Sequence, residues 1–175
     1  MRVLITLASL GLLGAPLQAA EAAEVDINLE LPRLQVAEYH RPYVAVWLSK
    51  PDHSVVSTLA VWYQQHNGPE GEGTKWLKDM RQWWRRIGRS LDLPIDGVTG
   101  PTRAPGTHHL TFSGPDSPFA GLEAGEYLLH VEASREVGGR EVLSLPFSWP
   151  GDNPQAQQVS GSLELGSVTL KISPE

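Results

Sequence analysis

Short stretches in which apolar and polar residues alternate constrain the fold of this chain most. From Val25 to Leu31 every odd position is apolar and every even position is polar, which is the period-two pattern of a strand with one buried face. Five further segments have strand patterns: 43–48, 55–63, 107–112, 127–133 and 142–149. Together with the tail they give seven or eight short strands, which predicts a mainly β, immunoglobulin-like antiparallel β-sandwich.

Single residues predict where some of these strands lie. Residues 43–48 are apolar on both faces, which indicates a central strand that pairs with 55–63. Pro146 cannot donate a ladder hydrogen bond, so the strand 142–149 should lie at a sheet edge or carry a bulge. The pair 138–139, two glycines, can take the positive φ angles of a two-residue hairpin turn that leads into this strand.

Two further features concern the second half of the chain. Apolar residues of the tail lie at odd positions before Gly166 and at even positions after it. Because a one-residue slip turns the apolar side chains outward, we predict a bulge or break at Gly166. Tyr127, which follows Gly125 and Glu126, resembles the tyrosine whose hydroxyl is pinned at a corner of immunoglobulin-like domains.

One helix is predicted, at about 75–88. Apolar residues recur there at helical spacing: Trp76, Leu77, Met80, Trp83, Trp84 and Ile87. Basic residues lie mostly on the opposite side: Lys75, Lys78, Arg81, Arg85, Arg86 and Arg89. This arrangement predicts an amphipathic, Trp- and Arg-rich helix inserted into the β domain.

The first residues have the layout of a secretory signal. Arg2 precedes an apolar run, 3–13, and the small-residue stretch 15–23 follows. We predict a signal peptide over 1–20, cleaved between 19 and 22, and a single domain over 21–175. The apolar run is shorter than the roughly 20 residues that cross a bilayer. Removing Arg2 leaves 13 basic against 20 acidic residues, and this acidic balance argues against a nucleic-acid partner.

Several blocks of sequence carry a family resemblance: 31–33, 36–47, 83–86, 96–106 and 125–127. The most specific block is Glu-Tyr-His-Arg-Pro-Tyr at 38–43. The chain resembles the predicted periplasmic proteins grouped as domain of unknown function 2271. The resemblance implies a bacterial periplasmic protein, and it implies an occurrence with PepSY-type membrane reductases, iron-uptake receptors and flavin transferases.

The segment 96–102 is similar to the acceptor motif of covalently flavinylated redox proteins. In that chemistry a flavin transferase moves FMN from FAD onto a hydroxyl group and forms a phosphoester. Asp96, Thr99 and Gly100 match the motif, and Thr102 would carry the FMN. Pro101 stands where the motif has alanine, and proline fixes φ and removes a backbone N–H. The alternative interpretation is a turn-rich connection into the next strand.

A phosphodiester on Thr102 would be stabilised by charge-assisted hydrogen bonds from Arg103, with Arg85 and Arg86 as further candidates. The resulting hypothesis is an electron-transfer module that carries FMN and works with a PepSY-type membrane reductase in iron uptake. No sequence pattern of a hydrolase is present. We therefore expect an electron carrier or binding domain, without catalytic residues, rather than an enzyme that transforms a substrate.

A second hypothesis is a non-catalytic adaptor domain that docks a membrane partner. Its candidate docking residues are Trp83, Trp84, Arg85, Arg86, His40 and Arg41. The two tryptophans could instead stack on the flavin ring or simply cover the sheet. His40 and Arg41 could form a recognition edge, or they could lead into a strand, with Arg41 paired to a carboxylate.

The third hypothesis is a metal site built from histidines. His108 and His109 are adjacent, so on a strand they point to opposite faces. The other four histidines are scattered along the chain. A site that joins His40 to another histidine stays an alternative, but we assign no metal ligands.

Overall fold

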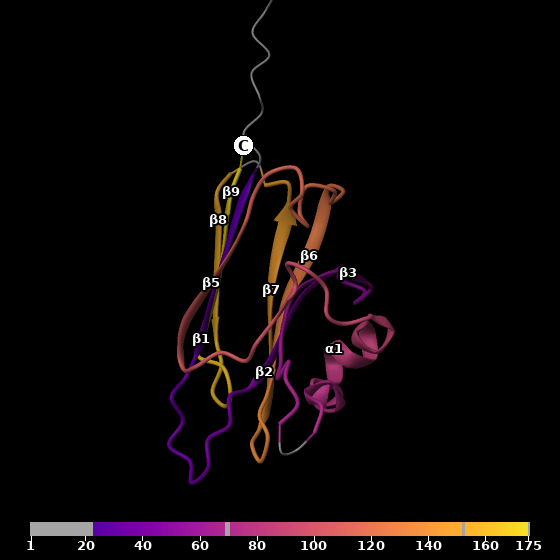
Figure 1. Ribbon diagram of the computed structural model, residues 1–175. Coiled ribbons are helices and arrows are strands. Elements are labelled where there is room, and N and C mark those ends of the chain that lie inside the picture. Colours follow the sequence, from indigo (N-terminus) through magenta and orange to yellow (C-terminus); the bar gives the residue numbers. More distant parts are fainter. Residues whose placement is uncertain (1–22, 69–70, 152, 175) are drawn as a thin grey trace, which may run out of the picture.

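The computed structural model describes residues 23–68, 71–151 and 153–174, which form two β-sheets packed face to face (Figure 1). The predicted signal peptide and its cleavage point lie outside these residues. The first sheet has the order β5-β1-β9-β8, with strands Gly106–Phe112, Glu24–Leu31, Ser167–Ser173 and Gln155–Ser160. The second has the order β4-β3-β2-β6-β7, with strands Thr99–Gly100, Val55–Trp62, Tyr43–Ser49, Gly125–Ser134 and Arg140–Trp149. The mainly β prediction is confirmed.

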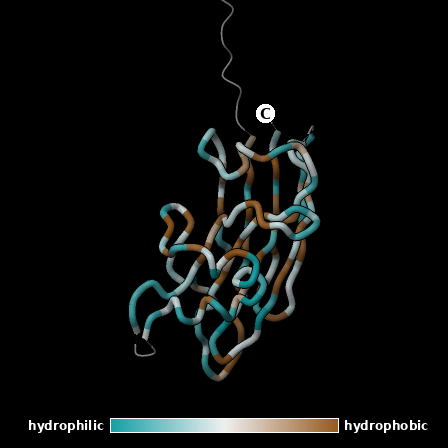
Figure 2. Tube along the Cα trace, turned by 90° about the vertical axis from the view of Figure 1, so that its right-hand side faces the viewer, coloured by the Kyte–Doolittle hydropathy of each residue, from teal (hydrophilic) through white to brown (hydrophobic). Residues whose placement is uncertain are grey.

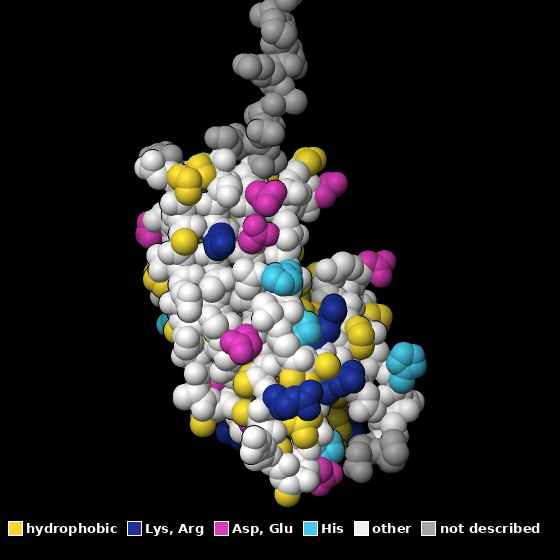
Figure 3. Space-filling view, turned by 90° about the vertical axis from the view of Figure 1, so that its left-hand side faces the viewer, with side chains coloured by type: hydrophobic (Ala, Val, Ile, Leu, Met, Phe, Trp, Pro, Cys, Tyr) yellow, Lys and Arg dark blue, Asp and Glu magenta, His cyan; other side chains and the backbone are white. Residues whose placement is uncertain are grey.

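The main core lies between the two sheets. The odd residues of β1, such as Ile27 and Leu29, are fully buried and pack with Val44 and Val46 of β2. Each such side chain contributes about 1.5–3 kcal/mol relative to an exposed position. The even residues of β1 face the other way, where Asn28 donates a hydrogen bond to Thr169. Figure 3 views the molecule from this side, where charged side chains and white surface, made of backbone and uncharged side chains, outweigh the hydrophobic side chains.

Strand β2, in the centre of the second sheet, is buried on both faces, which explains the uniformly apolar residues 43–48. The outer face of the sheet is covered by the segment 73–90 (Figures 1 and 2). We call the apolar group between them the outer cluster, which consists of Ala45, Trp47, Val61, Tyr63, Leu77, Met80 and Trp83. The predicted central position of the strand is confirmed, because β2 pairs with both β3 and β6.

The predicted helix over 75–88 is confirmed only in part, because the segment is helical but is not one continuous helix. The segment forms a 3₁₀ helix, η1, at Gly73–Asp79, a short α-helix, α1, at Arg81–Arg86, and a second 3₁₀ helix, η2, at Gly88–Ser90. Met80, between η1 and α1, interrupts the helical backbone because its ψ angle of 70° is not helical. The buried Glu132 carboxylate then accepts hydrogen bonds from the backbone N–H groups of Gln82 and Trp83, at 3.0 and 2.7 Å. A strand residue thus starts a new helix where periodicity predicts a continuous one.

Most predictions about single residues are confirmed. Strand β7, which contains Pro146, lies at a sheet edge. Strand β9 starts only after Gly166, whose N–H donates to the carbonyl of Glu30. The hydroxyl of Tyr127 donates to the carbonyl of Glu123 at 2.8 Å, which is the predicted tyrosine corner.

The predicted hairpin between β6 and β7 is confirmed, but its predicted two-residue turn is wrong. The connection between β6 and β7 has five residues, 135–139. A positive φ of 52° occurs at Val137, not at either glycine. Arg135 closes the turn because its N–H donates to the Gly139 carbonyl and its own carbonyl accepts from the Gly138 N–H. Strand β8 has no predicted counterpart, since its residues do not alternate between apolar and polar.

Candidate functional site

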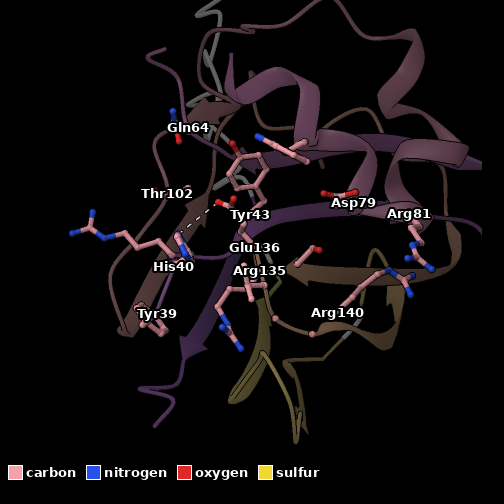
Figure 4. Close-up of a pocket in the computed structure, with 16 residues that line it drawn as sticks. Tyr39, His40, Tyr43, Gln64, Asp79, Arg81, Thr102, Arg135, Glu136 and Arg140 are labelled. Carbon is pink, nitrogen blue, oxygen red and sulfur yellow. Dashed lines mark ion pairs between the residues drawn. The ribbon is translucent and has the colours of Figure 1, made fainter. Parts of the chain in front are cut away.

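A cavity of about 670 Å³ opens at one end of the second sheet. It lies on the outer face, where β2 begins with Tyr43, β6 ends with Ser134 and β7 begins with Arg140. Residues 39–41 form one wall, and Trp76 from η1 lies on another. Figure 4 shows Thr102 and His40 on one side of Tyr43, and Asp79, Arg81 and Arg140 on the other.

Thr102 lines this cavity. It lies in the irregular connection between β4 and β5, and its side chain is half-buried. The connection reaches the cavity because β4 pairs in parallel with the end of β3, where the Tyr63 N–H donates to the Gly100 carbonyl at 3.0 Å. The predicted acceptor hydroxyl therefore sits at the edge of a cavity and not between the two sheets.

The other motif residues build the turn that precedes Thr102. The Thr99 hydroxyl donates to the Ile95 carbonyl at 2.9 Å and accepts from the Ile95 N–H at 3.1 Å. Asp96 is exposed in this turn, and Gly97 has a φ of 73°. A Cβ at Gly100 would lie 3.4 Å from the indole of Trp62, so a larger residue would crowd the tryptophan. None of these residues lines the cavity.

None of the three arginines predicted to bind a phosphate on Thr102 lines the cavity. The Arg103 guanidinium lies 4.9 Å from the centre of the Trp62 ring, a cation–π contact. Arg85 donates from Nε to the Arg81 carbonyl at 3.1 Å. Arg85 and Arg86 do not line the cavity, whereas Arg41 and Arg81 do. The spacing of residues in the sequence does not indicate that Arg81 lines the cavity. Arg81 reaches the cavity because the helix is interrupted at Met80.

Two more arginines line the cavity, and both are paired. Arg135 forms a buried bidentate ion pair with Glu164, at 2.9 and 3.1 Å. Its Nη1 atom is buried and has no hydrogen-bond partner among the residues described. Arg140 pairs with Glu132 at 2.5 Å, the same carboxylate that starts α1. These cations are therefore largely neutralised by the protein itself.

His40 and Arg41 also lie at the cavity. The His40 ring contacts Glu38 at 2.9 Å through Nε2 and Glu136 at 3.6 Å through Nδ1. The contact with Glu136 joins the 32–42 connection to the β6–β7 hairpin. Within 23–68, 71–151 and 153–174, Arg41 forms no ion pair with a carboxylate, so the expected pairing of Arg41 is replaced by that of His40.

Trp83 and Trp84, in the segment 73–90, differ in burial. Trp83 is fully buried in the outer cluster, and its indole N–H donates to Thr58 at 3.3 Å. It covers the sheet, which was one of its three interpretations, and it cannot contact a docking partner or a flavin ring. Trp84 is half-buried, while Arg85 and Arg86 are exposed.

Histidines do not form a metal centre in the part of the chain that the structure describes, which contains no group of three or more candidate ligand residues. His130 is buried between two serine hydroxyls, Ser49 at 2.8 Å and Ser144 at 2.7 Å. Its ring stacks on Trp47 with centroids 4.8 Å apart. Burial, with smaller effects of His53 and Arg86, lowers the pKa of His130 to about 4. His130 is therefore neutral at physiological pH and holds neighbouring strands together.

No curated protein and no solved structure matches this chain. The described residues include no helix with the length and hydrophobicity needed to cross a membrane. A family model described as "Predicted periplasmic protein" matches residues 24–167, and it confirms the predicted periplasmic location. The chain belongs to the family of predicted periplasmic proteins grouped as domain of unknown function 2271.

Proposed function

We propose that this protein is a periplasmic electron carrier that holds FMN covalently on Thr102. A flavin transferase would supply the FMN from FAD. The Thr102 oxygen attacks the FMN phosphorus, a new O–P bond forms, the phosphoanhydride bond breaks, AMP leaves and the hydroxyl proton passes to a base of the transferase. A membrane reductase of the PepSY type would exchange electrons with the bound flavin in iron uptake.

The observation that carries this proposal is the position of Thr102. Its hydroxyl group stands on an irregular connection, where another enzyme can approach it, and beside a cavity. The turn before it is held by Thr99, so the acceptor residue is presented on a defined backbone. Ligand cavities have volumes of about 300–1,000 Å³, and the cavity beside Thr102 falls in this range.

The residues around Thr102 suit a flavin in part. Arg41 and Arg81 are the exposed cations at the cavity. Arg41 follows His40, which lies on the same side of Tyr43 as Thr102 (Figure 4), and could bind the phosphate once it is on Thr102. Arg103 could do so only by leaving the Trp62 ring. When bound, FMN supplies one- and two-electron transfer, and the protein supplies its position and its surroundings.

Intact mass measurement tests the attachment. Co-expression with a flavin transferase should add the mass of one FMN phosphoester and give a fluorescent band under denaturing conditions. Thr102→Ala should abolish both signals. Thr107→Ala, at an exposed threonine of β5, is the matched control and should leave both intact. An unmodified wild-type protein would refute the proposal.

We also propose that the sandwich is immunoglobulin-like. The order β3-β2-β6-β7 corresponds to strands C′-C-F-G of that fold, and the pair β1–β5 corresponds to B–E. Tyr127 lies near the start of β6 and makes the hydroxyl hydrogen bond expected of strand F. The last strand, β9, then takes the place of strand A beside β1. An experimental structure that pairs β1 with β2 in one sheet would contradict this assignment.

The adaptor hypothesis has its own support. Six exposed cations lie along the segment 73–90: Lys75, Lys78, Arg81, Arg85, Arg86 and Arg89. None of them forms an ion pair with another described residue, although the chain has a net charge of −6. Such a basic face can steer an acidic protein partner.

Pull-down of the membrane partner distinguishes the two functions. Under the adaptor hypothesis, Arg85→Ala with Arg86→Ala should weaken capture, and the capture should fall as salt rises. Thr102→Ala should leave it unchanged. Capture that is insensitive to both arginines would place the docking surface elsewhere.

A further inference from the structure

Aromatic rings from three separate parts of the chain line the cavity beside Thr102. Tyr39 comes from the connection before β2, Tyr43 from the start of β2, and Trp76 from η1. All three side chains are half-buried. They are therefore shielded on one side by the protein and available on the other, as the lining of a ring-binding site must be.

Tyr43 is held in a fixed orientation. Its hydroxyl donates to the Gly73 carbonyl at 3.1 Å, and this bond ties η1 to β2. Its ring meets the ring of Tyr63 edge-on, with centroids 6.4 Å apart. Burial raises the pKa of the Tyr43 hydroxyl above its usual range, so the group stays a neutral donor. A ligand would find this ring already in place, which reduces the entropy lost on binding.

Polar groups border the same space. Gln64 and Ser134 line it from the ends of β3 and β6, and Arg81 and Arg140 stand on the side opposite Thr102 (Figure 4). A flat ligand with an apolar body and one edge of carbonyl and N–H groups matches such a lining. A dianionic ligand matches it poorly, because Arg135 and Arg140 are already paired with Glu164 and Glu132.

We infer that a planar tricyclic ring, the isoalloxazine of the flavin, binds in this cavity and contacts Tyr43 and Trp76. We call this ring-binding site the seat. The inference rests on the proposed function for the identity of the ring, but the cavity itself does not depend on attachment at Thr102. The phosphate and the ribityl chain link the ring to the threonine, so the ring can lie in the cavity while the phosphate stays at its edge. The contact would shield the ring from water on one face.

Flavin fluorescence tests the seat, because stacking on tyrosine or tryptophan quenches it. The flavinylated wild type should be quenched several-fold relative to the same protein after denaturation. Trp76→Leu should restore much of the emission. Tyr43→Phe, which keeps the ring and loses the bond to Gly73, should stay quenched. Trp84→Leu changes a half-buried tryptophan that does not line the cavity, and it should also stay quenched.

A second measurement separates the seat from the attachment. Riboflavin, which has the ring without the phosphate, is titrated into unmodified Thr102→Ala protein. Binding that weakens about tenfold in Trp76→Leu supports the seat even if the mass measurement shows no attachment. Attached FMN with full emission in the folded wild type, or riboflavin binding that Trp76→Leu leaves unchanged, overturns the seat and leaves the attachment standing. Far-UV circular dichroism verifies that each variant is folded.

Discussion

At the scale of single residues, the buried polar groups of this protein serve mainly structural roles. The half-buried Glu141 accepts backbone hydrogen bonds from all four residues of 162–165, at 2.7–3.0 Å. These bonds lower the pKa of its carboxyl group even though desolvation opposes them. Glu132 is buried and also accepts backbone hydrogen bonds, and the buried His130 is hydrogen-bonded to two serine hydroxyls. Of the predicted acceptor-motif residues, only Thr102 lines the cavity.

We predict that the pKa of His130 makes the protein lose stability in acid. The folded protein protonates His130 only at a pH of about 4, whereas the unfolded chain does so near 6.5. Between these values the unfolded state binds more protons, so the free energy of unfolding falls as the pH falls from 6.5 to 4. The loss from this group is about 3 kcal/mol. Above pH 6.5 both states are neutral and the effect vanishes.

Urea denaturation of wild type and His130→Asn, at pH values above 6.5 and near 4, measures this effect. The difference in stability between the two proteins should shrink toward the acid end, because the variant lacks the titrating group. Carboxylates such as Glu141 titrate in both proteins and cancel in the comparison. A difference that is constant across this range would show that His130 does not titrate as described.

At the scale of elements, the segment 73–90 is a set of short helices held by contacts to the sheet. A helix as short as α1, six residues at 81–86, is not stable by itself. It is stabilised by Trp83 in the outer cluster and by the Glu132 carboxylate at its start. Because Arg140 shares that carboxylate, the start of α1 and one wall of the cavity depend on the same buried group.

Glu132→Gln should therefore weaken the segment strongly. The substitution removes the charge that pairs with Arg140 and one of the two oxygen acceptors at the start of α1. Breaking a fully buried pair costs about 3–5 kcal/mol, and the cost here should be smaller because the Arg140 side chain is 32% exposed. Hydrogen exchange should report opening of 73–90 before the strands open. The control is Glu123→Gln at an exposed glutamate, which should have little effect. Equal protection of the segment in both variants would contradict the role of Glu132.

At the scale of the whole molecule, the second sheet lies between two apolar clusters, the main core and the outer cluster. Val44 and Val46 of β2 face the main core, and Ala45 and Trp47 face the outer cluster. The helical cover is therefore part of the folded domain and not an appendage to it. The cavity forms where this cover, the strand ends and the connections at residues 39–41 and 135–139 meet.

Trp83→Ala tests this cooperative arrangement. Trp83 is 0% exposed, and removing a buried tryptophan side chain costs about 3–5 kcal/mol. If the cover and the sandwich are one unit, near-UV and far-UV circular dichroism should report the same, lowered denaturation midpoint. Two separate transitions would show that the cover unfolds independently. Trp84→Ala, at the half-buried neighbour, should cost less.

The sequence by itself determined most of the strands, though not β4 or β8, together with the edge position of β7, the break at Gly166 and the tyrosine corner. Each of these depends on residues close together in the chain. The sequence also identified Thr102 and His40 as separate candidates. Only the tertiary structure brought them to one cavity with Tyr43, since parallel pairing of β4 with β3 decides where Thr102 lies. The division of the predicted helix was likewise decided in three dimensions, because the Glu132 carboxylate that starts α1 is about 50 residues away along the chain.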